Sequence, residues 1–182
     1  DVFSRPDHEN FSGPKQNNKR GSGKRDAAQK ALSRSQAHNG INKASDSGLN
    51  FESVYNMAKN SGAKYPELVA AQFQLESGGG TSELARKHNN LFGQKGKGVN
   101  YNTKEDGSNG MYEIKDDFKT FNNPQESVNY LVDRWYKDYD KYKGINNASN
   151  ADEAAKMLSS QGYATDRNYT NKLTSILRQK GY

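Results

Sequence analysis

The distribution of apolar side chains divides the chain near Gly48. Residues 1–48 hold few large apolar side chains, whereas from Leu49 onward apolar residues recur every three or four positions, the spacing of amphipathic helices. The first such segment follows Asn50, a residue type that caps helices. Its expected core-facing residues are Phe51, Val54, Met57 and Ala58. The pattern predicts that the folded region begins at about residue 49.

Proline and glycine mark the ends of the next helices. Pro66 suits the first turn of a second helix, and the glycines at 78–80 end it. Thr81 or Ser82 can cap a short third helix over 83–88. Three more helices are predicted: a long one from Pro124 to Tyr139, one over 151–161, and a last one that carries Tyr169, Leu173, Ile176 and Leu177.

Short β-prone runs separated by glycines occupy the region between these groups of helices. They predict a small antiparallel sheet with a turn at 106–110 and strands at 98–103, 111–114 and 118–121. Helices on both sides of this insertion indicate an α+β fold over residues 49–182, with a mostly helical lobe and a small antiparallel β insertion.

The chain is polar and basic, and its N-terminal part is the most basic. Hydrophobic residues make up 31% of the 182 residues, the mean hydropathy is -1.16 and the net charge is +6. Residues 1–48 hold nine Lys and Arg against five acidic residues. Such a segment buries too little apolar surface to order itself, beyond one short helix at 26–37. Two interpretations stay open: a solvated linker, or an arm that docks the domain onto a larger assembly.

Several classes of function lack the residues they need. The chain has no Cys, which excludes disulfides, thiol catalysis and Cys-bound zinc. The three histidines (His8, His38 and His88) are scattered, and the turn at 106–110 lacks the spaced acids of a calcium loop. We expect His88 to be a surface or hydrogen-bonding residue. The sequence predicts no metal and no cofactor, and no nucleic-acid-binding motif supports nucleic acid as a partner.

Glu76 is the first candidate for chemistry. It stands at the C-terminal end of a predicted helix whose other inward positions are apolar, just before the three glycines. The helix dipole and apolar neighbours both disfavour an ionised carboxylate, so we expect a raised pKa and a protonated acid. Beside a turn without side chains, such an acid can protonate a leaving oxygen that approaches closely. An ordinary surface glutamate near a helix end is the competing interpretation.

Further blocks accompany this segment along the chain. In order, they are Leu75-Glu76-Ser77-Gly78, Asn90-Leu91-Phe92-Gly93-Gln94-Lys95, Thr103-Lys104-Glu105, Phe118-Lys119-Thr120-Phe121 and Gln161-Gly162-Tyr163-Ala164-Thr165-Asp166, followed by Tyr169 and Lys172-Leu173. Together they resemble the peptidoglycan glucosaminidases of glycoside hydrolase family 73, which include flagellum-associated muralytic enzymes and autolysins. The resemblance covers residues 49–182 and implies a lysozyme-like fold.

The resemblance also implies roles for individual residues. Glu76 matches the general acid, Glu105 the second acidic position on the hairpin, and Tyr163 a tyrosine beside the catalytic glutamate. Glu113 is the main alternative to Glu105, and Asp106 and Asp116 are weaker ones. Asn90, Phe92 and Gly93 match the segment that shapes the floor of the substrate groove. Tyr101 and Tyr169 are also expected at the substrate, because they lie beside the predicted site and flat rings suit the faces of pyranose sugars.

Two departures from the family pattern concern substrate contacts. Gly79 stands where the family commonly has Trp, which removes one platform for stacking on a sugar. Lys119 and Phe121 stand where the family tends to have Arg and Tyr. Neither departure affects the proposed acid, so we expect altered subsite preference or weaker binding.

The implied activity is hydrolysis of the peptidoglycan glycan strand after N-acetylglucosamine. Glu105 could activate water as a base, or the 2-acetamido group of the substrate could attack instead. An N-acetylmuramidase or lytic transglycosylase is the enzymatic alternative, and a wall-binding or structural module of the same fold is the non-enzymatic one.

The start of the chain bears on where the protein acts. The chain opens on Asp, shows no signal peptide and has no apolar run of the roughly 20 residues that span a membrane. We therefore expect a processed piece, and the peptidoglycan substrate that the resemblance implies leads us to expect action outside the cytoplasm, in the cell wall or periplasm. Residues 1–48 would anchor it in a phage particle or a secreted assembly.

Overall fold

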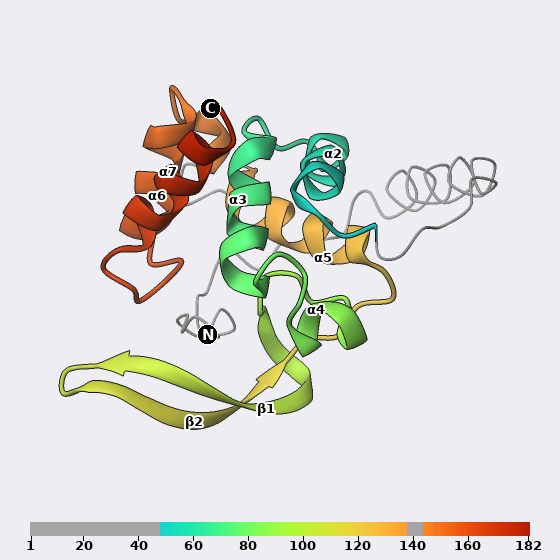
Figure 1. Ribbon diagram of the computed structural model, residues 1–182, viewed down its shortest axis with the longest axis vertical. Coiled ribbons are helices and arrows are strands. Elements are labelled where there is room, and N and C mark those ends of the chain that lie inside the picture. The colour runs from blue at the N-terminus through green and yellow to red at the C-terminus, as the bar shows by residue number, and fades with distance from the viewer. Residues whose placement is uncertain (1–47, 138–143) are drawn as a thin grey trace, which may run out of the picture. The chain divides into compact units, whose positions relative to one another are not determined.

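The computed structural model describes residues 48–137 and 144–182, with only the backbone of residues 105–107 (Figure 1). The expected arm over 1–48 and the helix expected at 26–37 therefore lie outside the described residues. The helices are α2 (Phe51–Ser61), α3 (Pro66–Ser77), α4 (Glu83–His88), α5 (Pro124–Leu131), the π-helix η1 (Val132–Tyr136), the 3-10 helix η2 (Ile145–Asn147), α6 (Ala151–Ser160) and α7 (Tyr169–Gln179). The strands are β1 (Lys95–Gly107) and β2 (Gly110–Phe118).

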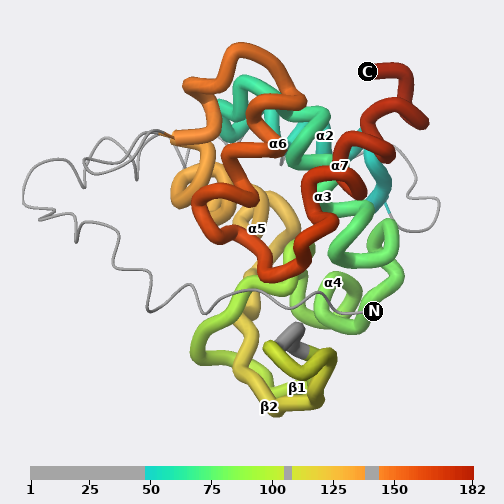
Figure 2. Tube along the Cα trace, turned by 90° about the vertical axis from the view of Figure 1, so that its left-hand side faces the viewer, coloured from blue at the N-terminus to red at the C-terminus, as the bar shows by residue number. Residues whose placement is uncertain are grey.

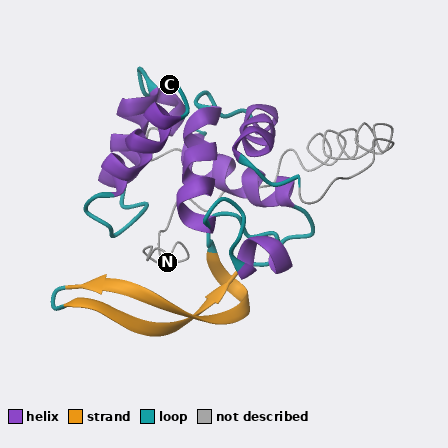
Figure 3. Cartoon of the chain, in the orientation of Figure 1, coloured by secondary structure: helices purple, strands orange, loops and turns teal. Residues whose placement is uncertain are grey.

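These elements confirm the α+β class. Figure 3 shows β1 and β2 together as one antiparallel hairpin, while helices make up most of the rest of the described chain. In both Figure 1 and Figure 2, α4 lies between the end of α3 and the hairpin. The helical lobe and the hairpin are therefore joined through the segment that follows α3.

Polar side chains cap four of the helices, and two of these caps, Asn50 and Ser82, are among those expected from the sequence. Asn50 and Ser53 form a reciprocal capping box at α2, and the side chain of Ser82 accepts from the backbone N–H of Ala85 at α4. Asn123 and Asn150 accept in the same way at α5 and α6. Each cap satisfies a backbone donor that has no partner within its own helix.

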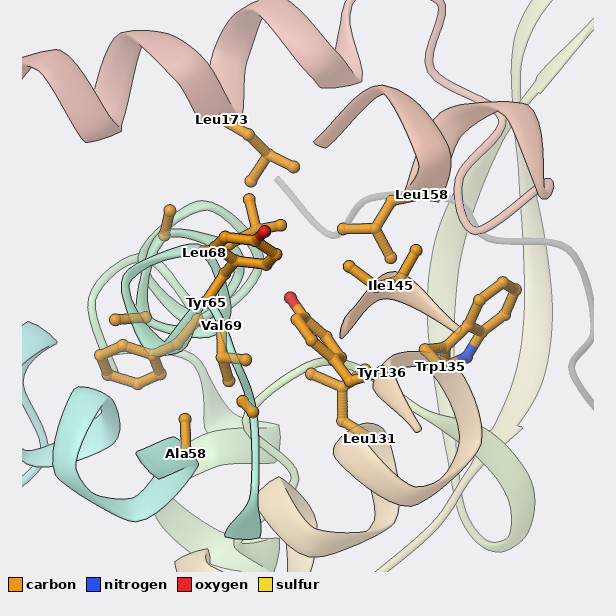
Figure 4. Close-up of a cluster of buried hydrophobic side chains, with 14 of the residues drawn as sticks. Ala58, Tyr65, Leu68, Val69, Leu131, Trp135, Tyr136, Ile145, Leu158 and Leu173 are labelled. Atoms are coloured by element: carbon orange, nitrogen blue, oxygen red, sulfur yellow. The ribbon is translucent and has the colours of Figure 1, made fainter. Parts of the chain in front are cut away.

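Helix α3 is the centre of the helical lobe. It packs against α2, α6 and α7, and its first buried side chains join the core shown in Figure 4. Burial on almost every side explains why apolar residues dominate the helix. Three polar residues, Gln72, Glu76 and Ser77, are nevertheless buried on it. The helix thus carries polar groups into an apolar core, where they need hydrogen-bonding partners.

The prediction of one long helix from Pro124 to Tyr139 is wrong in part. Helix α5 ends at Leu131, the next turn is the π-helix η1, and Tyr139 lies outside the described residues. A π-helix widens the turn and changes which side chains face inward. As a result the adjacent Trp135 and Tyr136 are both buried, and Figure 4 shows them pointing to different sides.

The prediction of three strands between residues 98 and 121 is wrong. There are two longer strands, and the chain leaves the sheet after Phe118. Beyond that point, the N–H of Lys119 donates to the carbonyl of Gln94 at 2.9 Å and the N–H of Phe121 to that of His88 at 3.0 Å. The run expected as a third strand is therefore bound to the end of α4 and the loop that follows it, and not to the sheet.

The base of the hairpin is fixed by a bulge and an ion pair. Phe118 lies opposite both Lys95 and Val99, which marks an irregularity in β1. The ammonium of Lys95 is 2.6 Å from the carboxylate of Asp116, and its side chain is only 6% exposed. A buried pair of this kind is costly to break, because one charge would be left unpaired.

A substitution at Gly98 tests whether the backbone at the bulge approaches Phe118 as closely as the structure shows. A Cβ at this position would lie 2.2 Å from the carbonyl oxygen of Phe118, a backbone atom that cannot rotate away. We expect Gly98→Ala to lower the free energy of unfolding by about 1–3 kcal/mol, measured by urea denaturation. Gly48→Ala is the matched control, since a Cβ there meets nothing within 4 Å. Equal stabilities of the two variants would contradict the tight approach at residue 98.

Candidate active site

Glu76 occupies the last turn of α3, where its side chain is almost fully buried at 6% exposure. The helix stops directly after it because three successive glycines adopt left-handed conformations, with φ of 60°, 68° and 92° at Gly78, Gly79 and Gly80. A Cβ on Gly79 would meet no atom within 4 Å. The turn beside the carboxyl is therefore open at Gly79 and free of side chains.

Two tyrosines hold the carboxyl of Glu76. The hydroxyl of Tyr169 donates to Oε1 at 2.9 Å, and that of Tyr163 donates to Oε2 at 3.3 Å. The two rings lie 5.6 Å apart, and the edge of Trp135 meets the Tyr163 ring at 4.9 Å. Burial disfavours the charged carboxylate, whereas hydroxyl donors favour it, so the two influences oppose each other. The two hydrogen bonds thus hold the carboxyl in one orientation.

Tyr163 lies where the sequence places it, beside Glu76, and Tyr169 lies there too. Both rings are fully buried, so Tyr169 presents its hydroxyl to the carboxyl instead of an exposed ring face. Asp166 orients the start of α7, which carries Tyr169: it accepts from the backbone N–H of Asn168 at 2.8 Å and from Lys172 at 2.6 Å. Burial acts to raise the pKa of Asp166, but these hydrogen bonds outweigh it and the pKa lies below its usual value.

The two candidate second acids occupy opposite faces of the hairpin. Glu105 pairs with Tyr112, and Glu113 pairs with Lys104. Because strand residues alternate, position 105 shares a face with Thr103, which is 4% exposed, whereas Lys104 and Glu113 are exposed. This face is therefore covered at Thr103, whereas Tyr112, directly opposite Glu105, is 52% exposed.

The weaker acidic candidates are placed by the same register. Position 106 lies opposite Met111, on the face of Glu113. Asp116 lies on the face of position 105, but its carboxylate is paired with Lys95. Asp116 therefore fixes the base of the hairpin.

The loop expected to shape the substrate groove is tied down internally. The side chain of Asn90 donates to the carbonyls of Gln94 at 2.8 Å and Lys119 at 2.9 Å, and it accepts from the N–H of Gln94 at 2.8 Å. Phe92 is fully buried, and Gly93 has a left-handed φ of 56°. These residues hold the loop that connects α4 to β1.

Tyr101 also acts at the base of the hairpin. Its hydroxyl lies 3.1 Å from Nε2 of His88, and the two rings meet edge to face at 5.9 Å. His88 is half-buried, in agreement with the hydrogen-bonding role expected for it. The pair connects the end of α4 to β1.

Gln72 and Tyr136 are buried near Glu76 and were not predicted from the sequence to belong to its site. Gln72 hydrogen-bonds to Tyr169 at 3.1 Å and to the hydroxyl of Tyr136. Burial raises the pKa of Tyr136 well above its usual value, and the neighbouring Tyr163 and Glu76 act in the same direction. A polar residue four positions before Glu76 on an otherwise apolar helix is the signal that could have revealed Gln72.

The described residues hold no group of three His, Cys, Asp or Glu side chains that could bind a metal ion. Within the same part of the chain, no helix is long and apolar enough to cross a membrane.

Curated relatives match the same region of the chain. The exo-glucosaminidase LytG of Bacillus subtilis is 40% identical over 124 residues, which cover 63% of this chain and 43% of LytG. The peptidoglycan hydrolase FlgJ of Escherichia coli K12 is 31% identical over 122 residues, which cover 62% of this chain and 39% of FlgJ. The chain thus spans about two fifths of the length of these relatives.

Solved structures share the fold. The catalytic domain of the autolysin Auto from Listeria monocytogenes superposes with a TM-score of 0.59 at 29% identity, covering 82% of this chain and 93% of that domain. A glycoside hydrolase domain of Salmonella typhimurium FlgJ gives a TM-score of 0.53 at 27% identity, covering 69% of this chain and 91% of that domain.

The family comparison covers the whole described region apart from its ends. The model for mannosyl-glycoprotein endo-beta-N-acetylglucosaminidase matches residues 51–181, the stretch that contains Glu76, the hairpin and both tyrosines. The motif blocks, the fold and this match agree, and the chain belongs to the glucosaminidase family, glycoside hydrolase family 73.

Proposed function

We propose that this protein hydrolyses the glycan strand of peptidoglycan at the N-acetylglucosaminyl β-1,4 bond. The observation that carries the proposal is the buried carboxyl of Glu76, held by two tyrosine hydroxyls beside an open glycine turn. The relatives LytG and FlgJ, named as an exo-glucosaminidase and a peptidoglycan hydrolase, support the substrate class.

Glu76 acts as the general acid in this proposal. Its protonated carboxyl gives a proton to the glycosidic oxygen as the bond to the sugar breaks. The open turn at Gly79 lets the polymer approach, and Tyr163 keeps the carboxyl oriented. On the opposite side of the sugar, either Glu105 activates water or the 2-acetamido group of the substrate attacks.

The substrate places the protein outside the cytoplasm, in the cell wall or periplasm. The net charge of +6 favours approach to anionic wall polymers. Residues 1–48 carry much of that charge, and we propose that they anchor the domain in a phage particle or another secreted assembly.

Replacing Glu76 tests the acid. Glu76→Gln is nearly isosteric but has no proton to transfer, so we expect the rate of glycan cleavage to fall by roughly 10²–10⁴-fold. The measurement is mass spectrometry of borohydride-reduced peptidoglycan digests, where new reduced N-acetylglucosamine ends report the proposed bond. Reduced or anhydro-muramic ends would instead indicate a muramidase or a lytic transglycosylase.

The exposed glutamate of α6 provides the control for this experiment. Glu153→Gln removes a carboxylate that pairs with Lys156 at the surface, so activity should stay unchanged. Activity of Glu76→Gln within a few-fold of the wild type would exclude Glu76 as the acid. A folded wild-type protein that releases no ends would favour a wall-binding or structural module.

A second pair of variants tests the hairpin. If Glu105 activates water, Glu105→Gln should lower the cleavage rate at least about tenfold, while Glu113→Gln, on the opposite face, should stay within about threefold of the wild type. A loss below about threefold in both variants would instead favour attack by the 2-acetamido group of the substrate. Both rates are measured with the same reduced-end assay. If Glu113→Gln loses more activity than Glu105→Gln, the preference for Glu105 over Glu113 as the second acid is wrong.

A further inference from the structure

A chain of hydrogen bonds runs through the core behind Glu76. The hydroxyl of Tyr136 donates to Oε1 of Gln72, and Nε2 of Gln72 donates to the hydroxyl of Tyr169 at 3.1 Å. Tyr169 in turn donates to Oε1 of Glu76 at 2.9 Å. Tyr136, Gln72 and Tyr169 are fully buried and Glu76 is nearly so. We call these four residues the Gln72 chain.

Three elements bring the Gln72 chain together. Gln72 and Glu76 lie four residues apart on α3, so their side chains share one face of the helix. Tyr169 comes from the first turn of α7, and Tyr136 from the π-helix η1. The widened turn of η1 allows Trp135 to pack on Tyr163 while its neighbour Tyr136 reaches Gln72.

The direction of the donors follows from the chemistry of each group. A tyrosine hydroxyl carries one proton, whereas a glutamine amide has an acceptor oxygen at one end and a donor nitrogen at the other. Tyr136 uses its proton on Oε1 of Gln72, which turns the amide nitrogen toward Tyr169. Tyr169 accepts from that nitrogen, and its own proton is left for Glu76.

This arrangement makes the two oxygens of Glu76 unequal. Oε1 accepts the shorter hydrogen bond, 2.9 Å from Tyr169, which makes it the less basic of the two oxygens and the weaker site for the acid proton. Oε2 has the longer contact, 3.3 Å to Tyr163. We infer that Gln72 and Tyr136 are positioning residues that direct the Tyr169 proton onto Oε1 of Glu76 and thereby make Oε2 the oxygen that releases the acid proton to the substrate.

The catalytic part of this inference rests on the proposed function of Glu76. Tyr136 is the residue that decides which way the Gln72 amide faces, and hence the direction of the hydrogen bonds along the Gln72 chain. If the amide of Gln72 turned over, its oxygen would accept the proton of Tyr169, and Glu76 would lose that donor. The hydroxyl of Tyr136 opposes this rotation because it needs the amide oxygen as its acceptor.

The titratable groups that face the Gln72 chain come from each surrounding element. They are Glu67 and Glu76 of α3, Tyr136 of η1, Tyr163 of the loop after α6, and Tyr169 of α7. Among them, Tyr136 stays protonated at neutral pH, since burial raises its pKa well above the usual value. A change in titration between about pH 3 and 8 is therefore assigned to a carboxyl group.

Tyr136→Phe tests the inference by removing one oxygen atom. Without that hydroxyl the amide can turn over, Glu76 loses a donor to its charged form, and the pKa of Glu76 rises. The alkaline limb of kcat/KM moves upward by the same amount, because catalysis needs the protonated acid. The weaker acid also lowers kcat by roughly three- to tenfold, with KM unchanged.

Tyr65→Phe is the matched control. Tyr65 is also buried, and its hydroxyl donates to the carbonyl of Ala148, outside the Gln72 chain. Each variant thus loses one buried tyrosine hydroxyl. We expect both to be less stable than the wild type, but only Tyr136→Phe to change the titration of Glu76. If Glu76 titrates at the same pH in Tyr136→Phe as in Tyr65→Phe, the inference is overturned and Tyr136 has only a structural role.

A titration by ¹³C NMR separates this inference from the proposed function. Glutamate labelled at the carboxyl carbon reports Glu76 directly, and Glu76→Gln identifies its signal without any turnover. In a Tyr169→Phe background, Tyr136→Phe should cause no further shift, because the coupling passes through Tyr169. A shift that persists in that background would overturn the inference. If the folded wild type releases no glycan ends, the proposed function fails, while the NMR titration still decides the role of Tyr136.

Discussion

A carboxyl group inside a helical core has to be hydrogen-bonded, because a buried polar group without a partner destabilises the fold. Glu76 imposes this requirement on the helical lobe, and helix α7 and the loop after α6 meet it through Tyr169 and Tyr163. Gln72 adds a second buried polar group on the same helix, which brings in Tyr136 of η1. The packing of three elements around α3 thus follows from two polar residues on one helix face.

The elements that carry these partners have their own supports. Asp166 accepts from Asn168 and Lys172 at the start of α7, which fixes the backbone next to Tyr169. The π-helix η1 gives up regular helical geometry, but it buries Trp135 and Tyr136 at once. The π-helix therefore does more than connect two helices, because it places Trp135 and Tyr136 in the surroundings of the Glu76 carboxyl.

The hairpin is attached to the helical lobe by separate interactions at its base. Lys95 pairs with Asp116, Gly98 allows a close backbone approach to Phe118, and Asn90 ties the preceding loop to the segment after β2. These contacts set the direction in which the hairpin leaves the lobe. The position of Glu105 relative to Glu76 therefore depends on groups distant from both carboxyls.

The amino-acid sequence by itself determined the local structure and the candidate acid. Caps such as Asn50 and Asn150, Pro66 and the glycines at 78–80 act within a few residues, so the limits of most helices and the site of Glu76 were predictable. Only the tertiary structure decided that α5 gives way to a π-helix and that residues 119–121 leave the sheet. It also decided that Gln72, Tyr136 and Tyr169 form one chain behind Glu76, because hydrogen bonds between residues 64 to 97 positions apart depend on how the helices pack.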